Sequence, residues 1–171
     1  MGRTPLREAL KRLESEHLVL TYPSRGTFAT TVDITALSEI SQVREVLEPL
    51  AARLAAERRG GAARERLERL REQLEEPPAG GREDTLRWDV AIHRAVYAAA
   101  GNAHLEATLT RYGNLATRIW CVAAGRIPQL QEHITVHADL LTAVLEGRAE
   151  GAAGIMLEHI REFEEQVRKV L

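Results

Sequence analysis

The stretch TLRWDVAIHRAVYAAAGN, residues 85–102, decides the fold because it is typical of an amphipathic helix. Its apolar residues recur every three or four positions, and Gly101 ends the run. Asp89 and His93 are four residues apart, so their side chains lie one helical turn apart on the same face. A carboxylate and an imidazole in this arrangement either bond to each other or offer two ligands to one metal ion.

The composition around this stretch favours a mostly helical protein. The chain has 171 residues, of which 44% are hydrophobic and only 4% aromatic, and Ala, Leu, Arg and Glu are abundant. The formal net charge of −2 means that any nucleic-acid contact needs a local basic patch. A single cysteine, Cys121, cannot form an internal disulfide. No apolar run is long enough to span a bilayer and no signal peptide is visible, so we expect a cytoplasmic protein with no membrane partner.

The beginning of the chain predicts a short helix followed by a hairpin. Residues 5–18 form an amphipathic pattern, and residues 18–22, 23–26 and 27–30 predict a strand, a tight turn and a second strand. A helix followed by a hairpin with a basic tip is typical of the back half of a winged helix-turn-helix.

From Asp33 onward the pattern predicts six helices in an antiparallel bundle. We expect Asp33 or Thr35 to cap the first helix and Pro49 to bend it. Its predicted apolar stripe consists of Leu37, Ile40, Val43, Leu47, Leu50 and Leu54. Besides the helix quoted above, the remaining helices are expected over about residues 63–74, 103–124, 128–146 and 150–169, separated by the Pro77–Gly81 break, Asn102, Gly125, Pro128 and Gly147.

Two further histidines extend the pair on residues 85–102. His137 and His159 are 159 − 137 = 22 residues apart, on consecutive helices joined near Gly147. At the usual helical rise they lie about 15 Å before and about 18 Å after that turn, so they come level in an antiparallel pair. With Asp89 and His93 they would form a set of one carboxylate and three imidazoles, which suits zinc, nickel, manganese or iron.

The spacing of these four residues is also compatible with a chain that binds no metal. Asp89 and His93 can be a pair on the helix surface, and His137 and His159 can be ordinary imidazoles. His133 also stands four residues before His137 and makes a second such pair.

In order and spacing, these features together resemble the GntR-type bacterial transcription regulators, in the FadR-like branch with an FCD effector domain. Residues 2–14, GRTPLREALKRLE, are similar to the family's recognition helix and the residues that lead into it. Residues 25–28, RGTF, are similar to the family's wing. Residues 43–48, VREVLE, are similar to the opening helix of the effector domain. Asp89-x3-His93, Gly101-Asn102 and His137-x21-His159 match its later signature. The resemblance covers nearly the whole chain.

The resemblance implies two domains and a ligand site. Residues 1–31 would be a partial winged-helix DNA-binding segment, and residues 32–171 an all-helical FCD-type effector, metal-binding and dimerisation domain. A divalent metal, with zinc as the first expectation, would be bound by Asp89, His93, His137 and His159. A small organic acid would dock beside the metal. The effector-binding candidates are Arg44, Asn114 and Arg118. Arg44 can hold both oxygens of a carboxylate, and it equally suits a salt bridge with Glu48.

The resemblance also names residues for DNA binding. Arg3 and Arg7 can reach guanine edges or phosphates, and Thr4 a phosphate oxygen, while Arg25 and Gly26 can enter the minor groove from the wing tip. The family's winged helix has two more helices before its recognition helix, and this sequence starts at the recognition helix itself. We therefore expect the chain as written to bind DNA weakly or not at all.

The predicted function is a metal-containing, small-organic-acid-responsive transcription repressor that binds operator DNA as a homodimer and is not an enzyme. Two alternatives stay open. One is a helical-bundle metalloenzyme that uses the same four ligands and an activated water. Against it, no glutamate stands obviously beside the ligands as a general base, although Glu132 or Glu158 could approach them. The other is a metal-free interaction domain with ordinary histidines.

Overall fold

The computed structural model describes residues 2–15, 18–58, 60–75, 81–127 and 132–171, with the backbone alone for Arg3, Glu75 and residues 132–134. It divides into two compact units, Met1–Asp33 and Ile34–Leu171. In the described ranges the fold is mostly helical with one small antiparallel sheet, as the sequence predicted. The predicted break at residues 77–80, the helix start at Pro128 and the side chain of His133 lie outside the described parts.

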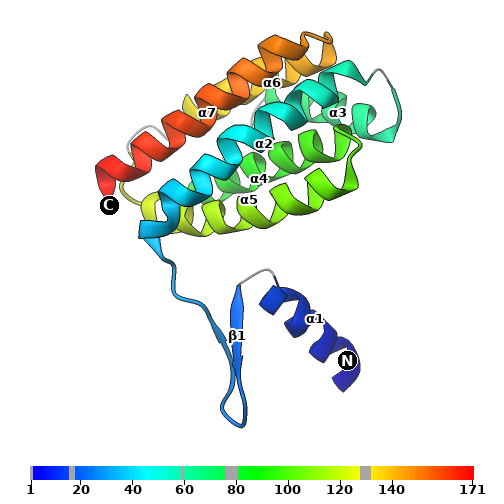
Figure 1. Ribbon diagram of the computed structural model, residues 1–171. Helices are drawn as coiled ribbons and strands as arrows, with labels where there is room; N and C mark the ends of the chain where they lie inside the picture. Colours follow the sequence, from blue (N-terminus) through cyan, green and yellow to red (C-terminus); the bar gives the residue numbers. More distant parts are fainter. Residues whose placement is uncertain (1, 16–17, 59, 76–80, 128–131) are drawn as a thin grey trace. The chain divides into compact units, whose positions relative to one another are not determined.

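The first unit consists of α1 (Arg3–Ser15) and a hairpin of β1 (Val19–Tyr22) and β2 (Gly26–Ala29), shown in Figure 1. The two strands are antiparallel, with Val19 opposite Ala29 and Tyr22 opposite Gly26. In the turn the Arg25 backbone N–H donates to the Tyr22 carbonyl at 3.1 Å, and Gly26 has a φ of 104°, a conformation that favours glycine. The helix and hairpin expected from the sequence are confirmed.

Few side chains of this first unit are buried. Leu6 on α1 is 55% exposed and Phe28 on β2 is 52% exposed. None of the unit's described residues reaches full burial. The unit therefore has little core of its own, as expected for one helix beside a two-stranded hairpin.

The second unit is a helical bundle that follows a short 3-10 turn, η1 (Ile34–Ala36). Apolar side chains from α2, α3, α4, α6 and α7 meet in one core, which includes Leu67, Ile92, Leu140 and Met156. In the described residues none of the helices is long and apolar enough to cross a membrane. The helices of the bundle are α2 (Leu37–Glu57), α3 (Ala62–Glu75), α4 (Arg82–Ala99), α5 (Ala103–Ala123), α6 (Glu132–Leu145) and α7 (Ala149–Val170).

The turns between these helices use the residues that the sequence suggested. Asn102 caps α5, because its Oδ1 accepts from the backbone N–H groups of His104 and Leu105 at 3.2 Å each. Gly101 and Gly147 follow α4 and α6 with φ values of 58° and 75°, the left-handed conformation that ends many helices. These turns set the lengths of the α4–α5 and α6–α7 hairpins.

The start of α2 differs from the prediction. The N-cap residue is Ala36, and no side chain makes a cap hydrogen bond there. The predicted caps Asp33 and Thr35 are wrong because the turn of η1 already precedes the helix. The helix continues through Pro49, and the predicted bend stays a prediction.

The buried face of α2 also differs from the predicted apolar stripe. Leu37 and Ile40 are buried, but Leu50 is 39% exposed, and the other three members of the stripe are only partly buried. The face turned inward instead carries Ser41, Arg44 and Glu48, followed by four alanines, Ala51, Ala52, Ala55 and Ala56. The physical reason is packing: small alanines let neighbouring helices approach closely, and the buried polar groups Arg44 and Glu48 are paired with each other.

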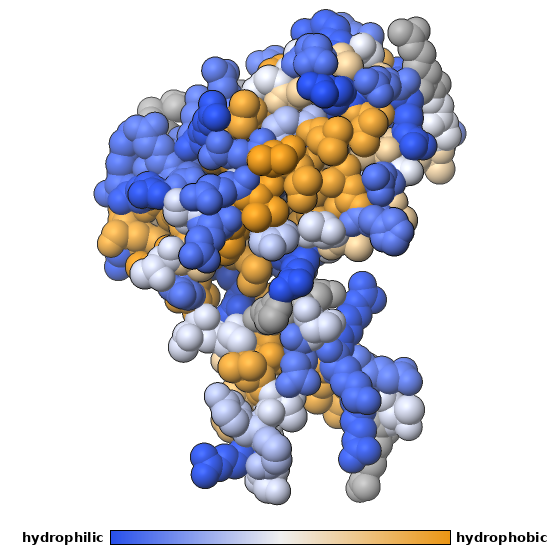
Figure 2. All heavy atoms as spheres, viewed as in Figure 1, coloured by the Kyte–Doolittle hydropathy of each residue, from blue (hydrophilic) through white to orange (hydrophobic). Residues whose placement is uncertain are grey.

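A consequence is that α2 keeps apolar side chains on its outer face. Val46 is 69% exposed, and Leu50 lies one turn further on. Figure 2 shows apolar side chains gathered on one face of the helical unit.

Candidate metal centre and adjoining cavity

Asp89, His93, His137 and His159 come together inside the bundle. The first two lie on α4, His137 on α6 and His159 on α7. All four residues are buried, with exposed fractions of 7% or less. One ligand atom from each residue lies within 4.8 Å of the others, so the four could hold a metal ion.

The local sequence explains how the four side chains meet. Asp89 and His93 share one face of α4 through their spacing of four residues. The turn at Gly147 returns the chain so that the His137 and His159 ring centroids lie 4.6 Å apart. The His93 ring centroid lies 5.4 Å from that of His137 and 5.1 Å from that of His159. His137 and His159 therefore lie side by side on the antiparallel helices α6 and α7, as the helical rise predicted.

The distances between donor atoms fit a divalent cation. Asp89 Oδ1 lies 3.3 Å from His137 Nε2, 3.5 Å from His93 Nε2 and 3.7 Å from His159 Nε2. The Nε2 atoms of His93 and His159 are 3.0 Å apart. In a tetrahedral site with ligands about 2.0–2.2 Å from the zinc, neighbouring ligand atoms lie roughly 3.3–3.6 Å apart, close to the distances seen here. Imidazole nitrogens with one carboxylate oxygen form a donor set that zinc and its neighbouring transition metals accept.

Glu48, on α2, lies directly behind this cluster and was assigned no site role from the sequence. Its Oε2 is 2.7 Å from His93 Nδ1, and its Oε1 accepts from Arg44 Nε at 2.5 Å. The Tyr97 hydroxyl lies 3.4 Å from the same His93 Nδ1. The signal that could have found Glu48 is its position with Ser41 and Arg44 on the alanine-rich face of α2, which places a carboxylate in the core.

The charges of this group stabilise one another. Burial alone would raise the pKa of Glu48, but Arg44 and His93 outweigh it and lower that pKa to about 2. Burial would lower the pKa of His93, but Glu48 and Asp89 raise it to about 9. The pKa of Arg44 is also raised, because Glu48 outweighs the effect of burial. Glu48 is therefore an anion at neutral pH.

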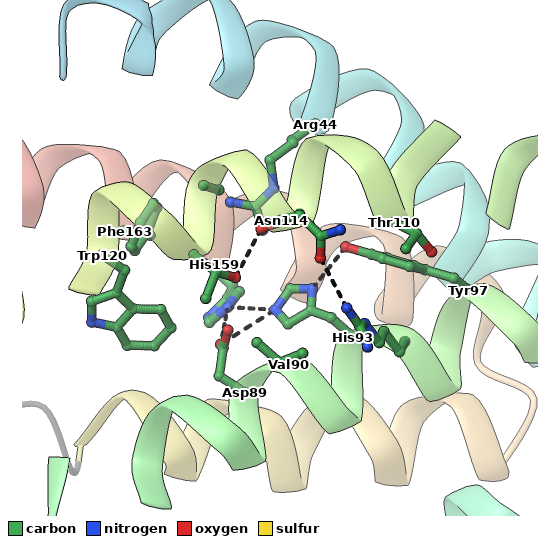
Figure 3. Close-up of a pocket in the computed structure, with 14 residues that line it drawn as sticks. Arg44, Asp89, Val90, His93, Tyr97, Thr110, Asn114, Trp120, His159 and Phe163 are labelled. Atoms are coloured by element: carbon green, nitrogen blue, oxygen red, sulfur yellow. Dashed lines mark hydrogen bonds and ion pairs between the residues drawn. The ribbon is translucent and has the colours of Figure 1, made fainter. Parts of the chain in front are cut away.

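A cavity opens beside the cluster. Residues of α2, α4, α5 and α7 line it, among them Asp89, His93 and His159 of the cluster. In Figure 3 the aromatic rings of Trp120 and Phe163 lie at one end of the cavity, and Tyr97 and Thr110 lie at the other, with Asp89, His93 and His159 between them. The ring centroids of Trp120 and Phe163 are 5.3 Å apart.

Two of the three predicted effector-binding residues line this cavity. Arg44 reaches it from α2, and its guanidinium carbon lies 5.7 Å from the centre of the Phe163 ring. Asn114 reaches it from α5, and its Oδ1 accepts from Arg94 Nη2 at 2.9 Å. Arg118, also on α5, is partly buried and is not among the described lining residues. The alternative salt bridge between Arg44 and Glu48 is present as well.

The residues predicted to bind DNA all lie in the first unit. Thr4 and Arg7 are exposed on α1, and Arg25 and Gly26 are exposed at the hairpin turn. The side chain of Arg3 lies outside the described parts. Of the two general bases considered for the enzyme alternative, Glu158 is exposed on α7, and the side chain of Glu132 is likewise not described.

The structure combines an all-helical bundle, which holds the buried cluster, with a helix-and-hairpin unit. The FCD domain family matches residues 39–162. The chain therefore belongs to this family, and it is a GntR-type transcription regulator with an FCD effector domain.

Known proteins are similar to this chain in sequence and in fold. The Nta operon transcriptional regulator of Aminobacter aminovorans is 28% identical over 179 residues, which span all of this chain and 80% of that protein. The structure of E. coli McbR/YncC is 24% identical and has a TM-score of 0.82, covering 99% of this chain and 81% of that one. Streptococcus agalactiae GntR is 22% identical with a TM-score of 0.64, covering 96% and 82% of the two chains. At these identities the two structures show the fold alone.

Proposed function

We propose that this chain is a metal-containing transcription repressor that responds to a small organic acid. The observation that carries the proposal is the buried cluster of Asp89 with three histidines, which opens onto a cavity that Arg44 also lines. A carboxylate in that cavity would reach the cluster and the guanidinium together. Such a site combines a metal ion with an anion-binding arginine.

The bound metal would supply positive charge and an open coordination position for a carboxylate oxygen. The protein's own side chains would do the rest. Arg44 donates to Glu48 through Nε, which leaves the two terminal nitrogens of its guanidinium as further donors for an anion. Trp120 and Phe163 would cover the carbon part of the effector and keep water from it.

On the DNA side we propose that α1 and the hairpin contact an operator, with Arg3, Thr4, Arg7, Arg25 and Gly26 as the contacting residues. The Nta operon regulator, similar along the whole chain, supports this assignment. A homodimer would present two such units to two half-sites, and effector binding would shift the dimer between states of different operator affinity.

The experiment that tests the metal centre is a titration of the purified, chelator-treated chain with Zn²⁺, Ni²⁺ and Mn²⁺, followed by elemental analysis. We expect about one ion per chain, and His137→Ala should lose it because a buried ligand is removed. His104→Ala is the matched control, because His104 is exposed at the start of α5 and lies outside the cluster. Absence of tight binding for all three ions would overturn the proposal.

Effector binding can be followed through Trp120, which lines the cavity. In a Trp88→Phe background Trp120 is the sole tryptophan, because the chain has two. We expect small carboxylates to change its emission when the metal is bound, and uncharged amides of the same shape to have little effect. Equal responses to acids and amides would contradict the assignment of an organic-acid effector.

A further inference from the structure

Glu48 touches both parts of the site without belonging to the ligand set. Its carboxylate is fully buried, with one oxygen 2.7 Å from His93 Nδ1 and the other 2.5 Å from Arg44 Nε. It lies on α2, a helix that supplies none of the four cluster residues. Glu48 therefore links α2 both to the cluster, through His93, and to the cavity wall, through Arg44.

The orientation of the His93 ring decides what this contact does. Its Nε2 faces the cluster, 3.5 Å from Asp89 Oδ1 and 3.0 Å from His159 Nε2. If Nε2 is the ligating atom, the proton of the neutral ring is on Nδ1 and needs an acceptor. The Glu48 oxygen at 2.7 Å is much nearer than the Tyr97 hydroxyl at 3.4 Å. A carboxylate behind a ligating histidine fixes its tautomer and ring orientation and makes it a stronger ligand.

We propose that Glu48 is the positioning residue of this site: it directs His93 Nε2 toward the metal and holds Arg44 at the cavity wall. The proposal rests on the proposed function, because it requires a metal at the cluster. It adds that α2 responds to metal binding through Glu48, although it contributes no ligand. Since linkage is reciprocal, the packing of α2 and metal affinity then influence each other.

A purely structural role for Glu48 is the alternative. Buried pairs such as Arg44 and Glu48 occur in proteins without any site nearby, and breaking one destabilises the fold. The two roles differ in what they predict for the metal. A structural pair affects folding, whereas a positioning residue also affects metal affinity, the geometry of the ion and the response of α2.

The test compares Glu48→Gln with Glu45→Gln, using Co²⁺ alone as the probe. Glu45 is a matched control because it lies on the same helix and also pairs with an arginine, Arg161, at 3.0 Å, but outside the cluster. We expect Glu48→Gln to bind Co²⁺ about 10–100-fold more weakly and to shift its visible absorption bands. Glu45→Gln should match the unmodified chain in both.

Hydrogen exchange gives the readout for α2. Co²⁺ should slow exchange of the α2 amides in the unmodified chain and in Glu45→Gln, and have a much smaller effect in Glu48→Gln. Unchanged Co²⁺ affinity, spectrum and α2 protection in Glu48→Gln would overturn this inference while leaving the proposed function intact. Failure of the unmodified chain itself to bind Co²⁺, Zn²⁺, Ni²⁺ or Mn²⁺ would overturn the proposed function.

A measurement on the unmodified chain covers the case in which Glu48→Gln does not fold. Nitrogen NMR of the zinc-loaded protein distinguishes the two tautomers of each histidine. We expect His93 to carry its proton on Nδ1, with the low-field shift of a short hydrogen bond. A His93 ring protonated on Nε2 in the zinc-loaded state would contradict the positioning role.

Discussion

At the residue scale, the chemistry of the site depends on pairing charges that burial would otherwise disfavour. Arg44 is only 6% exposed and Glu48 is fully buried, and each lies within hydrogen-bond distance of an opposite charge. The ion pair keeps a permanent anion behind His93 and a permanent cation at the cavity wall. This is a more specific role than the surface or structural pair that spacing along a helix suggests.

Arg44 gives a prediction at this scale. Arg44→Lys keeps the charge but replaces a flat group with several donors by a single ammonium, which cannot bind Glu48 and hold both oxygens of a carboxylate equally well. We expect acetate affinity of the metal-loaded chain to fall about tenfold, as measured by calorimetry. Arg53→Lys, in an exposed pair on the same helix, should leave it unchanged. Equal acetate affinity in both variants would remove Arg44 from the effector site.

At the scale of elements, short turns place the ligands by ending each helix at a defined residue. Gly101 ends the helix that carries Asp89 and His93, and Gly147 separates the helices that carry His137 and His159. An ideal Cβ on Gly101 would lie 2.1 Å from Arg58 Nη1, and that guanidinium donates to the Gly101 carbonyl at 3.2 Å. The Arg58 side chain is flexible and can move aside, so the sensitivity of this turn to an added side chain comes from the left-handed φ of 58° at Gly101.

Gly101→Ala tests the turn. The left-handed φ disfavours alanine by roughly 1–2 kcal/mol, and Arg58 must also move, so we expect a clear fall in the free energy of unfolding. Gly154→Ala is the matched control, since Gly154 is exposed within α7 with nothing near an added Cβ. It should stabilise by up to about 1 kcal/mol, because alanine favours helices. Urea unfolding measures both, and equal effects would contradict the role given to Gly101.

At the scale of the whole molecule, the proposed centre ties together three helices of the bundle. Its ligands come from α4, α6 and α7, and α2 joins through Glu48. A ligand that binds only the folded state stabilises it by mass action, by about 2.7 kcal/mol at a concentration 100 times its dissociation constant. The metal would therefore contribute to the stability of the bundle as well as to effector binding.

Metal removal gives the corresponding prediction. Chelator treatment should lower the Tm by several degrees, and excess Zn²⁺ should restore it. The Tm of His137→Ala should respond to neither treatment, while His104→Ala should behave like the unmodified chain. A Tm that is the same with and without metal in the unmodified chain would argue against a metal centre within the core.

The sequence by itself determined the features that depend on neighbours along the chain. The α4 helix and its Asp89–His93 spacing, the Asn102 cap and the hairpin turn at Gly26 follow from local propensities and turn chemistry. The level position of His137 and His159 also followed, because the rise of a helix is fixed and the connecting turn is short.

Only the tertiary structure decided which face of α2 is buried. Hydrophobicity predicted a stripe that includes Leu50, but the small alanines of the other face pack more closely, and this turns Arg44 and Glu48 inward. The same packing placed Glu48 behind His93 and brought Arg44 to the cavity, which Asn114 of α5 also lines and Arg118 does not. Burial of a face depends on what the surrounding helices offer it, and that information is spread over the whole chain rather than contained in one helix.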